Sequence, residues 1–585
     1  MDDRIALLES AVEDLRQTVL SMQQRLDAIA APVGTPAALL ALTPVPAEVE
    51  PRVLPARSKV KDPHDPIVIL SLVGRLLLVL AGGFFLRAMT DAGTLAVPVG
   101  ITLAFAYAAV WLFLADRAGG RGGLPNAVFH ALAAALVAFP LIVEATTRFK
   151  VLTGSGGAVV LSVASAAFLL VAWRRRVRAV GWLTVIGALP TSAAILVQTG
   201  VVVPFALFLV ALGLATLWLG YSIERWAGRW LAALAADLAV AGVTMRAFAP
   251  EHLDTPQVAM LLQLMLLVGY LGSIAIRTLV RGRDVTPFEA AQAAAALAVS
   301  LAGAVLMARA TDGVPAALGV AALLVGAACY VVAVMVVGKR EGSTLNFHFY
   351  TSLALVLVLA GFAIAVDGPW AGAAFALLAV AAIGQWSRRG APFLLAHGTV
   401  YLVGAGILAG SLSYSVRTLV AGAEGAWEVP DALMLVVLVA SALSAGLAAT
   451  RTPLPGDELA IGTRFLIVIV FVWIVAGSLT GYIAPLVGMQ ADRSVDPGVL
   501  ATVRTGVLSI ATLAIAWVGG HARLREWGWL VYPLLVGIGL KLMTQDFKHS
   551  RPATLFVALA LYGAALIIAP RLRRRSEKTA STAVA

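Results

Sequence analysis

The stretch IVILSLVGRLLLVLAGGFFLRAM, residues 67–89, decides how the rest of this chain is interpreted. An α-helix rises about 1.5 Å per residue, so an apolar run of this length crosses a hydrocarbon core of roughly 30 Å. The stretch therefore predicts a transmembrane helix, and it is the first such stretch in the chain. One residue in it is unusual for a membrane helix, because Arg75 lies within the apolar run.

Similar apolar stretches follow one another over residues 67–570, separated by short basic or Gly/Pro-rich loops. Of the 585 residues, 60% are hydrophobic and 13% are charged. A soluble protein carries about 25% charged residues. This pattern predicts an all-α, polytopic integral membrane protein with about 18 transmembrane helices. One of the predicted spans is residues 391–412, and the loop after it, 413–429, is long enough for an interfacial helix but not for a domain.

The formal net charge of +11 is explained by topology, without a nucleic-acid partner. Lys and Arg concentrate in alternate loops, as the positive-inside rule requires of cytoplasmic loops. We therefore expect both termini in the cytoplasm, including a basic tail at 571–585, and the bilayer of a bacterial inner membrane as the surroundings. The single cysteine, Cys329, excludes disulfides within the chain and a zinc site built from cysteines.

The N-terminal residues 1–30 predict a short cytoplasmic coiled-coil helix. Apolar residues recur over 4–30 at alternating spacings of three and four, namely Ile5, Leu8, Val12, Leu15, Val19, Met22, Leu26 and Ile29. Such a heptad favours a parallel homodimer, and the alternative is a lone amphipathic helix on the membrane surface. Residues 31–66 contain eight prolines and predict a disordered tether between the coil and the first span.

Two runs resemble a known family. They are GRLLLVLAGGFFLRAMTDAG at 74–93, followed by a span and the loop ADRAGGRGG, and WRRRVRAVGWLTVIGALPTS at 173–192. Both are similar to sequences in a bacterial family of multi-pass membrane proteins catalogued as a domain of unknown function. The resemblance implies the plan of coil, Pro-rich tether and long array of spans, in a bacterial cell membrane. It implies no activity and no catalytic residues.

Ionisable residues inside spans are candidate functional residues, because an unpaired charge in the bilayer costs several kcal/mol. Asp237 lies near the middle of its predicted span, and Arg75 lies at a similar depth in the first span. We therefore expect Arg75 and Asp237 to form a buried pair, serving either as a proton- or ion-coupling site or as a structural clamp.

A second possible pair is Arg87 with Glu144, near the outer ends of their spans. Pro140 precedes Glu144 by four residues and removes a backbone donor, which frees a carbonyl group that could line a wet cavity. The alternative is that both side chains extend separately to the membrane surface.

Further polar candidates lie at the predicted outer face: Glu251, His252, Asp254 and His549, with Lys541 and Asp546 close by. A carboxylate beside a histidine is suited to acid–base chemistry, and the alternative for all of these residues is solvated surface. No histidine pair has metal-binding spacing, and no phosphate-loop, GxSxG or HExxH motif is present. The sequence therefore predicts no metal and no cofactor.

Glycine pairs indicate close helix packing. Gly406 and Gly410 form one GxxxG motif, and Gly477 and Gly481 form another in a long span that also contains Pro485. A helix broken near Gly477–Pro485 would resemble the discontinuous helices of transporters.

Three functions agree with these patterns. The favoured one is a non-enzymatic transporter or flippase for a small or lipidic envelope substrate. The second is a membrane scaffold or sensor that recruits a partner through the coil. The third is an integral membrane enzyme acting on lipid-linked substrates, which the short outer loops disfavour.

Overall fold

The computed structural model describes residue 17 and residues 66–582, except for short gaps at 224–225, 250–254, 311–312, 341–343, 422–425, 454–455, 521–523, 525 and 548–551. The chain divides into two compact units, Met1–Leu72 and Val73–Ala585. The predicted coil (1–30, apart from the helical Gln17) and the tether before Pro66 lie outside the described residues.

The regular structure of the described residues is helical, joined by turns and loops, and includes one isolated antiparallel bridge between Met489 and Val495. The first ten helices are α2 (Pro66–Asp91), α3 (Val97–Gly120), α4 (Leu124–Thr147), α5 (Gly154–Arg175), α6 (Arg178–Thr199), α7 (Val203–Ser222), α8 (Gly228–Phe248), α9 (Pro256–Ala275) with η1 (Ile276–Val280), α10 (Pro287–Ala310) and α11 (Pro315–Met335) with η2 (Val337–Lys339). The others are α12 (Thr344–Ala365), α13 (Gly368–Arg389), α14 (Pro392–Leu408), α15 (Ser411–Leu419), α16 (Ala432–Ala449), α17 (Glu458–Gly488), α18 (Pro497–Val518), η4 (Trp527–Leu530), α19 (Val531–Lys541) with η5 (Leu542–Asp546), and α21 (Pro552–Thr582).

The helices confirm the all-α polytopic fold. Among the described residues, 16 helices are long and apolar enough to cross a membrane, or 17 if the bent pair α14 and α15 is one span. The sequence predicted about 18, so the count is slightly lower. The predicted first span, 67–89, lies within α2, which is not one of the sixteen.

Proline and glycine set many of the helix boundaries. Pro98, Pro204 and Pro392 each lie in the first turn of a helix, where a missing N–H costs no hydrogen bond. Gly200 and Gly390 end α6 and α13 in the left-handed conformation, with φ of 67° and 76°. The short loops that result place consecutive helices antiparallel to one another.

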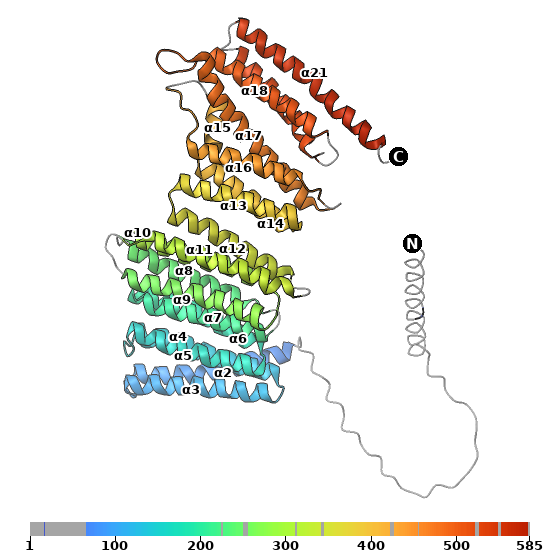
Figure 1. Ribbon diagram of the computed structural model, residues 1–585. Helices are drawn as coiled ribbons and strands as arrows, with labels where there is room; N and C mark the ends of the chain where they lie inside the picture. The colour runs from blue at the N-terminus through green and yellow to red at the C-terminus, as the bar shows by residue number, and fades with distance from the viewer. Residues whose placement is uncertain are drawn as a thin grey trace, which may run out of the picture. The chain divides into compact units, whose positions relative to one another are not determined.

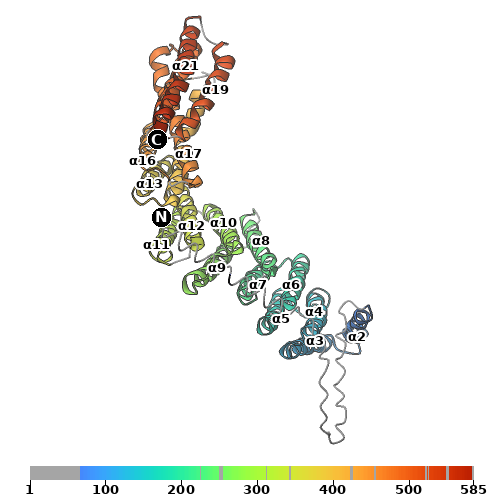
Figure 2. The same cartoon turned by 90° about the vertical axis from the view of Figure 1, so that its right-hand side faces the viewer.

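Helices pack mainly on their neighbours in sequence, as the two views in Figures 1 and 2 show. The most extensive pairings are α3 with α4, α7 with α8, α11 with α12, α13 with α14, and α18 with α21. Small residues make these approaches close: a Cβ on Gly319 of α11 would clash with Ala365 and with the carbonyl oxygen of Gly361 on α12. In the absence of a hydrophobic drive between helices in lipid, such close packing holds membrane helices together.

The break in the helical array is not where the sequence indicated. The possible break at Gly477–Pro485 does not occur, because α17 runs without interruption from Glu458 to Gly488. The bend lies between α14 and α15, which meet at 64°. Gly410 occupies the joint with φ of 73°, a conformation that favours glycine. Gly406 and Gly410 therefore do not share one helix face, and their predicted role as a GxxxG packing motif is also wrong.

Candidate functional site

Arg87 and Glu144 form the pair that the sequence predicted. Arg87 Nη1 on α2 lies 2.7 Å from Glu144 Oε1 on α4. Arg87 is 37% exposed and Glu144 is 24% exposed, so neither side chain is sealed in the interior. The geometry contradicts the alternative in which the two side chains extend separately to the surface.

Two further charges extend this pair into a chain of four. Asp91, one turn after Arg87 on α2, forms ion pairs with both arginines: its Oδ2 lies 3.8 Å from Arg87 Nε and 3.4 Å from Arg148 Nη2, and only the second is a hydrogen bond. Arg148 follows the last residue of α4. Positive and negative groups therefore alternate, and the cluster as a whole has no net charge. Partly exposed pairs of this kind contribute about 0–1 kcal/mol each, so stability alone does not explain them.

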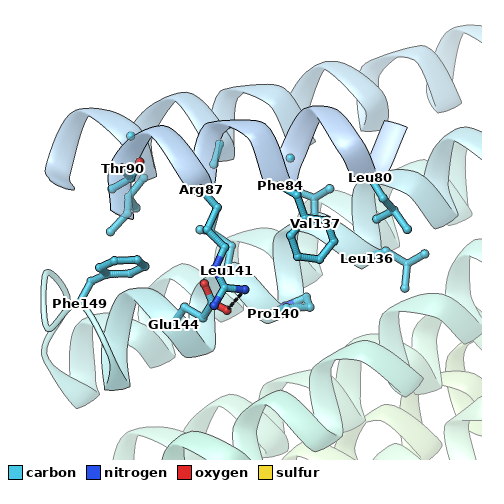
Figure 3. A pocket seen from close by; sticks show the side chains of 14 residues that line it. Leu80, Phe84, Arg87, Thr90, Leu136, Val137, Pro140, Leu141, Glu144 and Phe149 are labelled. Atoms are coloured by element: carbon cyan, nitrogen blue, oxygen red, sulfur yellow. Dashed lines mark ion pairs between the residues drawn. The ribbon is translucent and has the colours of Figure 1, made fainter. Parts of the chain in front are cut away.

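The Arg87–Glu144 pair lines a cavity of about 300 Å³ between α2, α3 and α4. Figure 3 shows Arg87 reaching across from α2 to Glu144, with Thr90 and Phe149 at one end and Leu80 and Leu136 at the other. The remaining walls are Gly83, Phe84, Gly100, Ile101, Ala104, Val137, Pro140 and Leu141. The cavity, called the α2–α4 cavity below, thus has a charged pair towards the end formed by Thr90 and Phe149, and an apolar end at Leu80 and Leu136.

The shape of the α2–α4 cavity follows from small residues and from Pro140. Gly83 leaves space on α2, because a Cβ there would meet only Val137, at 3.5 Å. Tyr107 on α3 donates to the carbonyl oxygen of Val79 at 2.9 Å and holds α2 against α3. Pro140 is within α4 and cannot donate to the carbonyl of Leu136. Leu136 and Pro140 also line a second cavity, of about 400 Å³, between α4 and α6.

Arg75 and Asp237 do not pair, contrary to the prediction. Arg75 is exposed on α2. Asp237, on α8, is 7% exposed and accepts hydrogen bonds from Gln292 Nε2 on α10, at 2.9 Å to Oδ1 and 3.1 Å to Oδ2. Equal depth in the membrane was the basis of the prediction, but α8 packs on α6, α7, α9 and α10.

The sequence reasoning missed a buried carboxylate, Glu289. This residue is 0% exposed in the first turn of α10 and forms an ion pair with Arg277. Tyr221 donates to it at 2.7 Å, and the N–H and hydroxyl of Thr286 donate at 2.7 and 2.8 Å. The spacing of Thr286 and Glu289 is that of a capping box, which is the signal that could have revealed it.

The glycines of α17 do pack closely, as predicted, and they pack against α15. A Cβ on Gly477 would overlap Ser415, and one on Gly481 would overlap the Tyr414 ring. Thr418 donates to the Gly477 carbonyl at 3.2 Å. The loop predicted at 413–429 had room for a helix, and α15 overlaps its first part, beginning at Ser411 within the predicted span 391–412 and packing directly against α17.

Arg504 on α18 binds the C-terminal end of α15. Its guanidinium donates to the carbonyl oxygens of Thr418 at 2.6 Å, Arg417 at 3.3 Å and Ala421 at 2.5 Å, and to Gln545 Oε1 at 3.2 Å. A cation at this position compensates the unpaired carbonyl groups and the partial negative charge of a helix C-terminus. Arg504 is 4% exposed, and no pattern in the sequence singled it out as a candidate residue.

Lys541 and Asp546 form a buried pair beside Arg504. Lys541 Nζ lies 2.6 Å from Asp546 Oδ1 and donates to Thr505 Oγ1 at 2.6 Å, while Thr505 donates to Asp546 Oδ2 at 2.7 Å. Asp546 is 0% exposed, so its assignment to solvated surface is wrong. A second buried pair joins Arg464 Nη1 to Glu526 Oε1 at 2.8 Å.

Four outer-face candidates, Glu251, His252, Asp254 and His549, lie outside the described residues. Within the described residues, no group of three or more His, Cys, Asp or Glu side chains is arranged to hold a metal ion.

Comparison with known protein families, with curated proteins and with solved structures finds no match to this chain. The resemblance to a family of unknown function therefore stays a prediction, and the functional argument rests on the geometry of the sites.

Proposed function

We propose that this multi-pass membrane protein binds an amphipathic lipid in the α2–α4 cavity and moves it between membrane leaflets. The observation that carries the proposal is the division of the cavity into a charged end and an apolar end. Ligand cavities are typically apolar with a few polar groups that fix orientation. A lipid would place its headgroup near Arg87 and Glu144 and its chain towards Leu80 and Leu136.

The alternating charges favour a zwitterionic headgroup. Arg87 would face a phosphate and Glu144 an ammonium group, because these two are the charged residues that line the cavity. An anionic headgroup would pair with Arg87 but would be repelled by Glu144. The adjoining cavity between α4 and α6 offers additional apolar space, since it shares Leu136 and Pro140 with the first.

The experiment compares two glycine variants of the full chain in proteoliposomes. Gly83→Leu fills the cavity, whereas Gly74→Leu adds the same side chain to α2 at a position with nothing within 4 Å. Native mass spectrometry measures bound phosphatidylethanolamine and phosphatidylglycerol, and quenching of a fluorescent phosphatidylethanolamine measures transbilayer movement.

We expect Gly83→Leu to weaken phosphatidylethanolamine binding about tenfold, which equals about 1.4 kcal/mol of binding free energy, and to slow its movement about tenfold. Binding and movement should be unchanged in Gly74→Leu. Equal binding and movement in the two variants would show that the cavity is not the site. Preferential binding of phosphatidylglycerol would contradict the zwitterionic headgroup.

Localisation and orientation belong to the same proposal. We place the protein in a bacterial inner membrane with both termini in the cytoplasm, supported by the concentration of Lys and Arg in alternate loops. Cysteine labelling from either side of intact cells, with one cysteine introduced in each loop of the otherwise Cys329→Ser chain, tests this orientation.

A further inference from the structure

Asp237 is a buried carboxyl group with a neutral partner. The side chain projects from the middle of α8 towards α10, where the amide of Gln292 donates to both of its oxygens. No lysine or arginine forms an ion pair with Asp237 in the described part of the chain. It differs in this respect from Glu289 and Asp546, each of which is paired with a cation.

The surrounding ionisable groups leave this charge uncompensated. The helices packed on α8 carry Arg178 on α6, Tyr221 on α7, Tyr270 on α9, and Glu289 and Arg309 on α10, and α8 itself carries Arg229 and Arg246. Arg229 and Arg246 are each about 12 Å or more from Asp237 along the helix axis, beyond ion-pair distance. Arg178 is exposed at the start of α6, and Arg277 binds Glu289.

Polar groups without partners lie in the same layer of helices. The Tyr270 hydroxyl and Gln263 Oε1, both on α9, are buried and have no hydrogen-bond partner among the described residues. Glycines make room for both side chains: a Cβ on Gly213 of α7 would overlap the Tyr270 hydroxyl, and one on Gly303 of α10 would overlap the Gln263 amide. The Gly213 position also adjoins Ala236, the neighbour of Asp237 on α8.

We infer that Asp237 is a proton-binding site within the membrane, which takes up and releases a proton during the working cycle. An unpaired carboxylate is costly in an apolar environment, so the resting form is the neutral acid. On release, the proton leaves to water and the electron pair stays on the carboxylate, where the Gln292 N–H group stabilises both oxygens.

The chemistry of the site favours a proton over a metal cation. Hard cations such as Ca²⁺ require several oxygen ligands, whereas Gln292 presents an N–H donor to Asp237. This inference goes beyond lipid binding and does not depend on the α2–α4 cavity, because the residues involved are on α8, α9 and α10.

The test is labelling of the full chain in proteoliposomes by dicyclohexylcarbodiimide, a reagent that enters the bilayer. A protonated carboxyl adds to the reagent: its proton moves to a nitrogen and its oxygen bonds to the central carbon. The acyl group then shifts to nitrogen, giving a stable N-acylurea that keeps all atoms of both reactants.

Peptide mass spectrometry locates the adduct, and Glu289 is the matched control, since it is buried but paired with Arg277.

We expect Asp237 to be labelled and Glu289 not, with labelling of Asp237 falling as the pH is raised from about 5 to about 9, the range in which buried carboxyls titrate. The Asp237→Asn variant loses the adduct. Gln292→Leu removes the donor that stabilises the Asp237 anion, so we expect Asp237 in this variant to be labelled up to a higher pH. This pH profile tests proton binding by Asp237 even if Asp237→Asn fails to fold.

Two results overturn the inference. One is an Asp237 that stays unlabelled at the lowest pH or labels independently of pH. The other is protection by sodium ions at constant pH, which assigns the carboxyl to a metal cation.

Discussion

The charges around the α2–α4 cavity and those around α15 are of the same residue types, but they are placed differently. Arg87, Asp91, Glu144 and Arg148 are 24–49% exposed and form ion pairs with one another, and Arg148 also lies over the Phe149 ring. Arg504, Lys541 and Asp546 are 0–9% exposed. Arg504 and Lys541 donate to main-chain carbonyls as well as to side chains, and Asp546 accepts from Lys541 and Thr505. The partly exposed charges of the first group can still hydrogen-bond to a ligand, whereas the buried charges of the second group are already hydrogen-bonded within the protein.

This contrast teaches that a charge in a membrane helix is not in itself evidence of a binding site. Arg504 lies in a helix long and apolar enough to cross a membrane, yet its guanidinium donates to the end of α15 and to Gln545. Arg87 looks like a residue at the membrane surface, yet it lines a cavity. The predictions below test this difference, beginning with the largest expected effect.

Replacement of Arg504 by leucine should cost the most. It leaves the carbonyls of Arg417, Thr418 and Ala421 without this donor in a buried place, at about 1–3 kcal/mol for each unsatisfied group. We expect little folded protein, measured as the monodisperse fraction after detergent extraction. Arg417→Leu is the control, because Arg417 is 60% exposed on the same short helix and should extract normally. If Arg504→Leu is extracted as folded protein in normal yield, Arg504 is not needed to bind the C-terminal carbonyl groups of α15.

A leucine at Gly477 should have the next largest effect. The new side chain would collide with Ser415 and force α15 away from α17, and overpacking of this kind costs about 1–3 kcal/mol. Thermal unfolding in detergent measures the loss. Gly462→Leu is the matched control on α17, since nothing lies within 4 Å of a Cβ there. Equal melting temperatures for the two variants would contradict the close contact of α15 with α17.

Glu144→Gln should change stability little and lipid binding more. The partly exposed pair with Arg87 contributes at most about 1 kcal/mol to folding. Without the carboxylate, the polar end of the cavity gains net positive charge, so we expect preference to shift from phosphatidylethanolamine towards phosphatidylglycerol in native mass spectrometry. An unchanged lipid ratio would show that Glu144 does not contact the headgroup.

Deletion of residues 1–30 should have the smallest effect on the array, because these residues precede all of the predicted spans. If they form the predicted coiled coil, the deletion converts a dimer to a monomer, as measured by mass photometry, while the melting temperature stays the same. A chain that remains dimeric locates the subunit contact elsewhere. If cells with the truncated protein behave like cells that lack the whole protein, although lipid movement in proteoliposomes is intact, the scaffold function is favoured.

Pairings between distant helices could be predicted only in part. Arg87 and Glu144 were found because they lie at similar depths on helices that are close in the chain, with one span between them. The same depth argument failed for Arg75 and Asp237, since depth says nothing about lateral position in the membrane. The contact of Glu289 with Thr286 could have been predicted from the capping-box spacing of these two residues. No local pattern predicts the contact of Arg504 with α15, because α15 lies more than 80 residues earlier in the chain.

The sequence by itself determined the class of protein, the positions of nearly all helices and the close packing at Gly477 and Gly481. These follow from apolar length and from local backbone preferences, which act within about 20 residues. Only the tertiary structure decided which charges pair, where the helical array bends and which polar groups keep free capacity. Those outcomes depend on how helices pack side by side, because in lipid the partner of a buried charge is set by helix contacts and not by hydropathy.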